Sequence, residues 1–157
     1  MPEVLAAIRP DSVNLPLFLH VLGAMALVGS LFAVGLATVL GRRSPDGAPG
    51  LAHFGLKTLL FGALPAYVVM RVGAQWTEAE QDYPDDFEAN WIDIGYMVSD
   101  AGALLLLISV VLAAIGLRRS RDDASRGVRL ARMVAGISVL LLAAFLVAVW
   151  AMTAKPT

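Results

Sequence analysis

The stretch LFLHVLGAMALVGSLF, Leu17 to Phe32, is apolar except for His20 and Ser30. It lies inside a longer apolar run, Val13 to Leu40, in which His20 is the one ionisable residue. An α-helix needs roughly 20 predominantly apolar residues to cross a bilayer core of about 30 Å. The run therefore predicts a membrane-spanning helix, and the histidine within it needs a physical explanation.

Three further runs are as long and carry few charges: Leu51 to Val72, Trp91 to Leu117 and Val128 to Thr153. Hydrophobic residues make up 58% of the 157 residues, whereas a soluble domain is usually about 45–50% apolar with glycine included. Pro65 predicts a kink in the second helix. The sequence predicts one all-α domain over residues 1–157, a polytopic bundle of four transmembrane helices at about 14–40, 51–74, 91–117 and 127–153.

The chain contains no cysteine, which excludes disulfides, thiolate metal sites and thiol redox chemistry. Its start carries Glu3, Arg9 and Asp11 before a long apolar run, unlike a cleaved signal peptide, so the first run is predicted to remain as a helix. The pattern contains no phosphate loop, Ser/His/Asp set or zinc-protease motif, and an enzymatic activity is not indicated. The few arginines are better explained by membrane topology than by a nucleic-acid partner, and none is predicted.

The loops differ in charge. The first connection holds Arg42 and Arg43, and the third is also rich in arginine. The middle connection, residues 73–90, has no Lys or Arg and six acidic residues. The positive-inside rule then predicts a multi-pass protein of the plasma membrane with both arginine loops in the cytoplasm and both termini outside. The three tryptophans fall at the outer interface, where such rings are favoured; they are Trp76, Trp91 and Trp150.

Several polar residues share the outer half of the predicted bundle. At 1.5 Å per residue, His20 lies about 8–9 Å and Asp100 about 14 Å below the outer helix ends. Ionisable residues at membrane depth usually face the bundle interior and pair with one another. We therefore expect an outward-facing polar pocket in which Asp100 pairs with His20 or Arg71. The candidate ligand-binding or proton-carrying residues are His20, Tyr67, Arg71, Tyr96 and Asp100.

His20 is followed one turn later by Gly23 and Ala24, which leave room beside the imidazole. That room could hold a cofactor, a water chain or the backbone of another helix. His20 is the candidate metal ligand, and a haem b is one candidate cofactor. His53 lies about 15–25 Å away in height, so the two histidines cannot bind one iron within the chain. A haem would then need Met70, Met97 or a symmetry-related His20 as its second axial ligand.

Two further features concern the bilayer. His53 and Lys57 stand near the inner end of the second helix and are predicted to contact anionic lipid headgroups. In the first helix, Gly29, Ala33 and Ala37 are small residues four apart. Such spacing lets helices approach closely, either within the bundle or in a homo-oligomer.

The motif His20, Gly23, Ala24 and Gly29 resembles the first helix of bacterial membrane proteins grouped with copper-resistance protein D. The segments PAYVVMRVGAQW and WIDIGYMVSDAG are similar to an uncharacterised four-helix branch of such proteins. The resemblance implies a plasma-membrane protein and, distantly, copper handling, with His20 as the matched ligand.

Three functional hypotheses remain open. The first is a protein whose outer pocket binds or conducts an ion or small solute. The second is a haem-binding or redox accessory subunit that uses His20. The third is a structural partner subunit whose polar groups only hold helices together. We also expect energetic coupling between His20 and Asp100, because either group unpaired in lipid would be costly.

Overall fold

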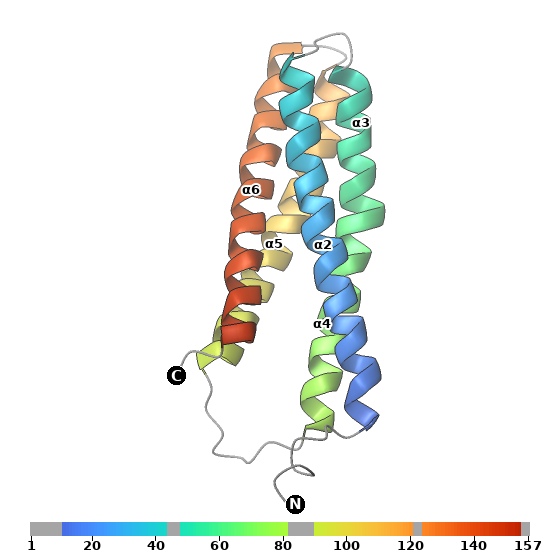
Figure 1. The fold of residues 1–157 in the computed structure, drawn as a ribbon. Helices are drawn as coiled ribbons and strands as arrows, with labels where there is room; N and C mark the ends of the chain where they lie inside the picture. The colour runs from blue at the N-terminus through green and yellow to red at the C-terminus, as the bar shows by residue number, and fades with distance from the viewer. Residues whose placement is uncertain (1–10, 44–47, 82–89, 121–123, 155–157) are drawn as a thin grey trace, which may run out of the picture.

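The computed structural model describes residues 11–43, 48–81, 90–120 and 124–154, and over these ranges the chain is all-helical (Figure 1). Four helices are long and apolar enough to cross a membrane, by length and composition. The elements are α2 (Asp11–Arg43), α3 (Ala48–Thr58), η2 (Leu59–Ala63), α4 (Leu64–Glu80), α5 (Asn90–Arg119) and α6 (Ala124–Ala154). The second span is continuous from α3 through the π-helical turn η2 into α4 and runs on to Glu80, six residues beyond the predicted range 51–74.

The irregularity expected at Pro65 takes the form of the π-helical turn η2, which ends just before it. Proline lacks an N–H, and its ring would collide with the carbonyl four residues earlier in a regular α-helix, that of Phe61. The π-turn inserts one extra residue, and the Leu64 N–H bonds to the Leu59 carbonyl five residues back. The helix thus passes the proline without ending.

The four spans form two antiparallel pairs, α2 with α3–η2–α4 and α5 with α6. At the end where α2 and α5 begin, which we call the terminal end, the two pairs diverge (Figure 1). Towards the opposite end, which we call the arginine end, they share a core of large apolar side chains. Leu27, Leu31, Leu59, Leu106 and Leu141 are each at most 2% exposed there. The core is therefore tight in the middle of the bundle and absent between the pairs at the terminal end.

The α5–α6 pair is built on small residues seven positions apart along α5: Gly95, Gly102, Ser109 and Gly116. A Cβ on Gly102 would lie 2.8 Å from the Phe145 ring, so the absence of a side chain lets the ring reach α5. Close approach at small residues replaces the hydrophobic drive that is missing between helices in lipid. The two helices therefore form one close-packed hairpin.

The small residues of α2 do not form a single outward face. Ala37 is buried within the chain, at 4% exposure. A Cβ on Gly29 would meet nothing within 4 Å. A homo-oligomer packed on this stripe stays a prediction.

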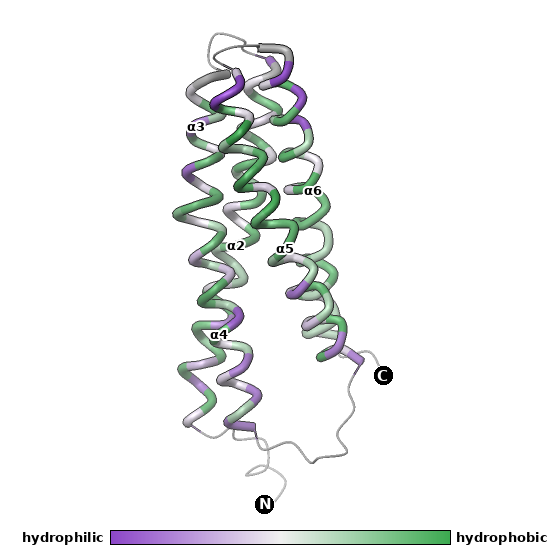
Figure 2. Tube along the Cα trace, turned by 180° about the vertical axis from the view of Figure 1, so that it is seen from behind, coloured by the Kyte–Doolittle hydropathy of each residue, from purple (hydrophilic) through white to green (hydrophobic). Residues whose placement is uncertain are grey.

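Charges separate along the bundle, while the shafts are hydrophobic (Figure 2). Large apolar side chains are exposed along the shafts, among them Phe61 at 79%; this is expected of a surface that faces lipid rather than water. The charged residues of the three connections lie outside the described residues: Asp46, Asp82, Asp85, Asp86, Glu88, Arg121, Asp122 and Asp123. Of the described ones, the acidic residues lie in the terminal half: Asp11, Glu78, Glu80, Asp93 and Asp100. Apart from Arg71, the described basic residues lie towards the arginine end: Arg43, Lys57, Arg118, Arg119, Arg126, Arg129 and Arg132.

Candidate functional site

Arg71 on α4 and Asp100 on α5 form an ion pair across the terminal half of the bundle. Arg71 Nη2 lies 2.9 Å from Asp100 Oδ1. The same guanidinium lies over the ring of Tyr96, 4.5 Å from its centroid, which adds a cation–π contact. The Arg71 side chain is 23% exposed and that of Asp100 is 65% exposed, so the carboxylate lies on the outside of the bundle rather than in its interior. Of the two partners expected for Asp100, the structure selects Arg71.

Two tyrosines, Tyr67 and Tyr96, add further hydrogen bonds between α4 and α5 on either side of the ion pair along the bundle. The Tyr67 hydroxyl donates to the Ser99 carbonyl at 3.3 Å and accepts from the Ser99 hydroxyl at 3.3 Å. The Tyr96 hydroxyl donates to the Glu78 carboxylate. The backbones of α4 and α5 make little direct contact, so these side chains form most of the contact between the two helices. We call this set the α4–α5 polar ladder: Tyr67, Arg71 and Glu78 with Tyr96, Ser99 and Asp100.

His20 does not pair with Asp100, which corrects one expectation from the sequence. Its Nδ1 lies 2.9 Å from the carbonyl oxygen of Met70. A carbonyl only accepts hydrogen bonds, so Nδ1 must carry the proton. In the neutral imidazole Nε2 then presents a lone pair. His20 therefore bridges α2 to α4, and its second nitrogen remains available as an acceptor or a ligand.

The space beside His20 is occupied by the backbone of α4, one of the three occupants expected from the sequence. A Cβ on Gly23 would lie 2.7 Å from the Met70 Cα and 2.8 Å from the Ala66 carbonyl oxygen. A Cβ on Gly73 would lie 2.5 Å from the backbone nitrogen of His20. The two glycines allow α2 and α4 to touch at successive turns, and this contact brings the imidazole to Met70.

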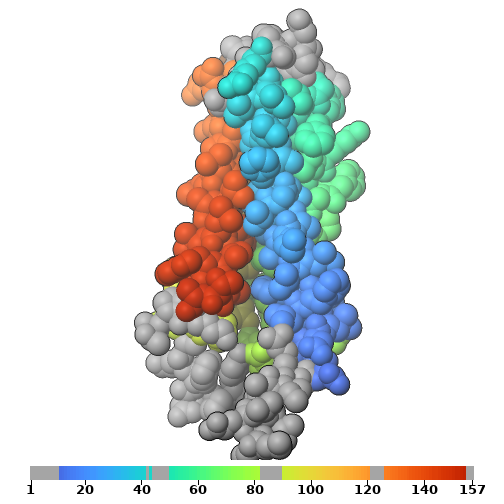
Figure 3. Space-filling view, in the orientation of Figure 1, coloured from blue at the N-terminus to red at the C-terminus, as the bar shows by residue number. Residues whose placement is uncertain are grey.

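A cavity of about 590 Å³ lies between the two helix pairs in the terminal half. Figure 3 shows the cleft between α2 and α6 that leads to it. Its wall is mostly apolar, and it includes three of the five predicted residues: His20, Arg71 and Tyr96. Tyr67 and Asp100 do not line it, although Ser99, the hydrogen-bond partner of Tyr67, does. The apolar wall includes Leu17, Val21, Met25, Trp91, Phe145, Leu146, Val149 and Met152. Glu78 is a wall residue that the sequence did not single out.

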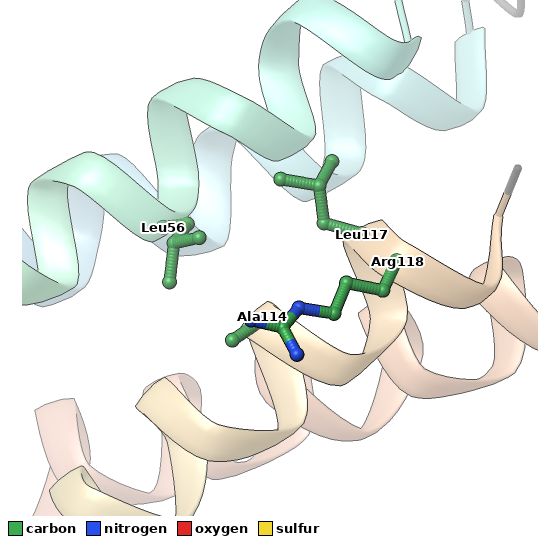
Figure 4. Close-up of a pocket in the computed structure, with 4 residues that line it drawn as sticks. All are labelled: Leu56, Ala114, Leu117 and Arg118. Atoms are coloured by element: carbon green, nitrogen blue, oxygen red, sulfur yellow. The ribbon is translucent and has the colours of Figure 1, made fainter.

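His53 and Lys57 are not part of this site. His53 lies at the arginine end, about 26 Å along the bundle from Met70 and hence from His20, at the rise of an α-helix. Beside Lys57, Leu56 lines a smaller cavity of about 280 Å³ between α3 and α5, together with Ala114, Leu117 and Arg118 (Figure 4). Arg118 is a candidate for contact with lipid headgroups that the sequence did not single out.

The described residues contain no group of three or more His, Asp or Glu side chains placed to hold a metal ion. Metal binding at His20 would therefore rely on methionine sulfur, which Met25 and Met152 offer in the same cavity wall.

The fold and the cavity define a class: a four-helix bundle of membrane type with an amphipathic cavity in one half. Comparison of the chain with family models, curated proteins and solved structures finds no match. The functional assignment therefore depends on the chemistry of the site.

Proposed function

We propose that the chain is a multi-pass plasma-membrane protein that binds a small solute in the cavity between its helix pairs. The observation that carries this proposal is the cavity itself, about 590 Å³ in volume and within the range of ligand sites, with apolar walls and a few polar groups. The separation of charges supports an orientation with the arginine end in the cytoplasm, so that the cavity belongs to the outer half.

Binding is favoured over conduction. The polar side chains of the cavity all lie in the terminal half, whereas the core towards the arginine end is filled by leucines such as Leu31, Leu59 and Leu106. An ion crossing this core would lose its hydration and meet few ligands; the buried side-chain oxygens without a partner there, over the described residues, are the hydroxyls of Ser109 and Ser138. The cavity therefore ends blind in this conformation.

The polar ladder by itself would also suit a purely structural subunit. Its hydrogen bonds hold α4 to α5, as that hypothesis expects. It does not account for a cavity lined by residues of all four spans. Solute binding accounts for both the ladder and the cavity and is therefore the better-supported function.

Because the chain lacks cysteine, single cysteines test the cavity and the orientation together. Ala148 and Ala135 are both α6 alanines, 7% and 8% exposed, and Ala148 lines the cavity. In sealed right-side-out vesicles, a membrane-impermeant maleimide should label Ala148→Cys at least tenfold faster than Ala135→Cys. It should also label Ala154→Cys and leave Ser120→Cys unlabelled until the vesicles are opened. Equal slow labelling at positions 148 and 135 would exclude an open cavity, and labelling at position 120 in sealed vesicles would reverse the orientation.

A haem-binding subunit is the second candidate, because His20 presents Nε2 in the cavity while Nδ1 donates to a backbone carbonyl. This arrangement is typical of histidines that ligate a metal. His20 would supply one axial ligand, and Met25 or Met152 could supply the other. Bound haem would give the chain an electron-transfer role.

If this second candidate is correct, protein purified from haem-sufficient cells should show a Soret band that His20→Ala removes. His53→Ala is the matched control and should leave the band intact. A protein without the band, even after haem is added, would exclude this candidate. The copper handling implied by the resemblance would use the same atoms, and copper binding that needs His20 but not His53 would support it.

A further inference from the structure

The polar groups of the cavity wall are almost all engaged within the protein. The Thr77 hydroxyl donates to the Gly73 carbonyl at 2.7 Å, and the Thr153 hydroxyl to the Val149 carbonyl at 3.0 Å. Tyr96, Ser99 and Arg71 are engaged in the polar ladder. His20 donates from Nδ1 to the Met70 carbonyl, and Nε2 of the neutral tautomer is then a hydrogen-bond acceptor. A ligand in this mostly apolar cavity thus meets two side-chain acceptors with spare capacity, His20 Nε2 and the Glu78 carboxylate.

The cavity opens sideways. Figure 3 shows that the cleft lies between α2 and α6 on the flank of the bundle. Apolar lining residues of α2 and α6 are also partly exposed: Val21 at 47%, Met25 at 69%, Leu146 at 52% and Val149 at 43%. In a bilayer this flank faces lipid. A molecule dissolved in the outer leaflet could therefore enter without crossing water.

The charges of the wall disfavour an anionic ligand. The Arg71 guanidinium is already paired with Asp100 and stacked on Tyr96, so an anion would have to displace a carboxylate. Glu78 accepts the Tyr96 hydroxyl through one of its two oxygens, so its carboxylate is the alternative acceptor that the His20→Leu variant distinguishes. A neutral molecule with a hydrogen-bond donor meets no such competition at His20 Nε2.

We propose that the occupant is a neutral lipophilic molecule with a hydroxyl head, of the alkylphenol class, which enters from the bilayer between α2 and α6. Its O–H donates to His20 Nε2, its ring lies among the apolar side chains of the cavity, and its chain extends through the cleft towards lipid. This inference rests on the proposed function and specifies the ligand class.

The test uses a pair of probes that differ by one donor: a para-alkylphenol that carries a bromine on its ring, and its methyl ether. Bromine quenches tryptophan at short range, and Trp91 lines the cavity. The full chain carries Trp76→Phe and Trp150→Phe and is held in lipid nanodiscs, with empty nanodiscs correcting for partitioning. One hydrogen bond predicts that the phenol half-quenches Trp91 at a roughly three- to tenfold lower concentration than the ether. His20→Leu should remove that difference.

Two further measurements separate hydrogen bonding at His20 from binding in the cavity as a whole. In the wild-type protein labelled with ¹⁵N-histidine, the phenol should shift the Nε2 resonance of His20 and the ether should not. Ala148→Phe, which fills the cavity, should weaken quenching by both probes, whereas Val147→Phe, exposed on the same helix, should not. Equal quenching by the two probes, or a preference that survives His20→Leu, would overturn the hydroxyl assignment while the cavity remained a binding site. Quenching by neither probe, with Ala148→Cys also unreactive, would overturn both proposals.

Discussion

Gly73→Ala is expected to lower the free energy of unfolding by about 2–3 kcal/mol, the upper part of the range for overpacking. The added methyl group would lie 2.5 Å from the backbone nitrogen of His20 and 2.9 Å from the Pro16 carbonyl oxygen. These are backbone atoms, so no side-chain rotation relieves the collision and α2 must move away from α4. Gly23→Ala should have a similar effect, because its methyl group meets the backbone of Met70. Unfolding midpoints in mixed micelles of mild detergent and SDS would measure both losses.

The matched controls are Gly29→Ala and Gly136→Ala. Both are helical glycines at which a methyl group meets nothing within 4 Å. Alanine is a better helix former than glycine by up to about 1 kcal/mol, so these changes should be neutral or stabilising. Equal losses at all four glycines would contradict the close contact between α2 and α4, as would the absence of a loss at Gly23 and Gly73.

Breaking the Arg71–Asp100 pair is the second large effect. Arg71→Met and Asp100→Asn should each cost about 2–3 kcal/mol, somewhat below the loss for a fully buried pair because Asp100 is 65% exposed. The double variant should cost less than the sum of the two, with a coupling of about 1–2 kcal/mol. The same micelle titration would provide the four stabilities of this double-mutant cycle.

A second cycle provides the control. His20→Ala with Asp100→Asn should be additive, because the structure bonds His20 to the Met70 carbonyl and not to the carboxylate. Coupling of 1 kcal/mol or more between these two would restore the pairing that the sequence suggested. Additivity between Arg71→Met and Asp100→Asn would show that the two side chains do not form a stabilising ion pair.

The sequence was sufficient for the four spans, because hydropathy over 20 residues depends on composition and not on packing. It was also sufficient to group Arg71, Tyr96 and Asp100, because the helical rise gives their depth directly. The rotation of each helix about its axis is set by contacts between helices. The choice between His20 and Arg71 as the partner of Asp100 therefore had to come from the structure.

Glu78 shows a different limit. Together with Tyr67 and Arg71 it lies at spacings of four and seven residues, which is one face of a helix. The acidic composition of residues 73–90 predicts a helix end near residue 74, which places Glu78 in the loop. The α-helix continues to Glu80, so the carboxylate reaches Tyr96. The signal that identifies Glu78 in the sequence is the helical spacing of polar residues, which persists beyond the apolar run.

The divergence of the two helix pairs has a mechanical consequence. Each pair is stiff, because its two helices pack closely at glycines, whereas at the terminal end side chains join α4 to α5. The terminal helix ends lie about 24 Å from the leucine core at the helical rise, so a rotation of about 5° between the pairs would displace those ends by about 2 Å. A rotation of one helix pair against the other about the leucine core therefore displaces the terminal helix ends the most. The width of the cleft is then controlled by the length of a few hydrogen bonds between α4 and α5.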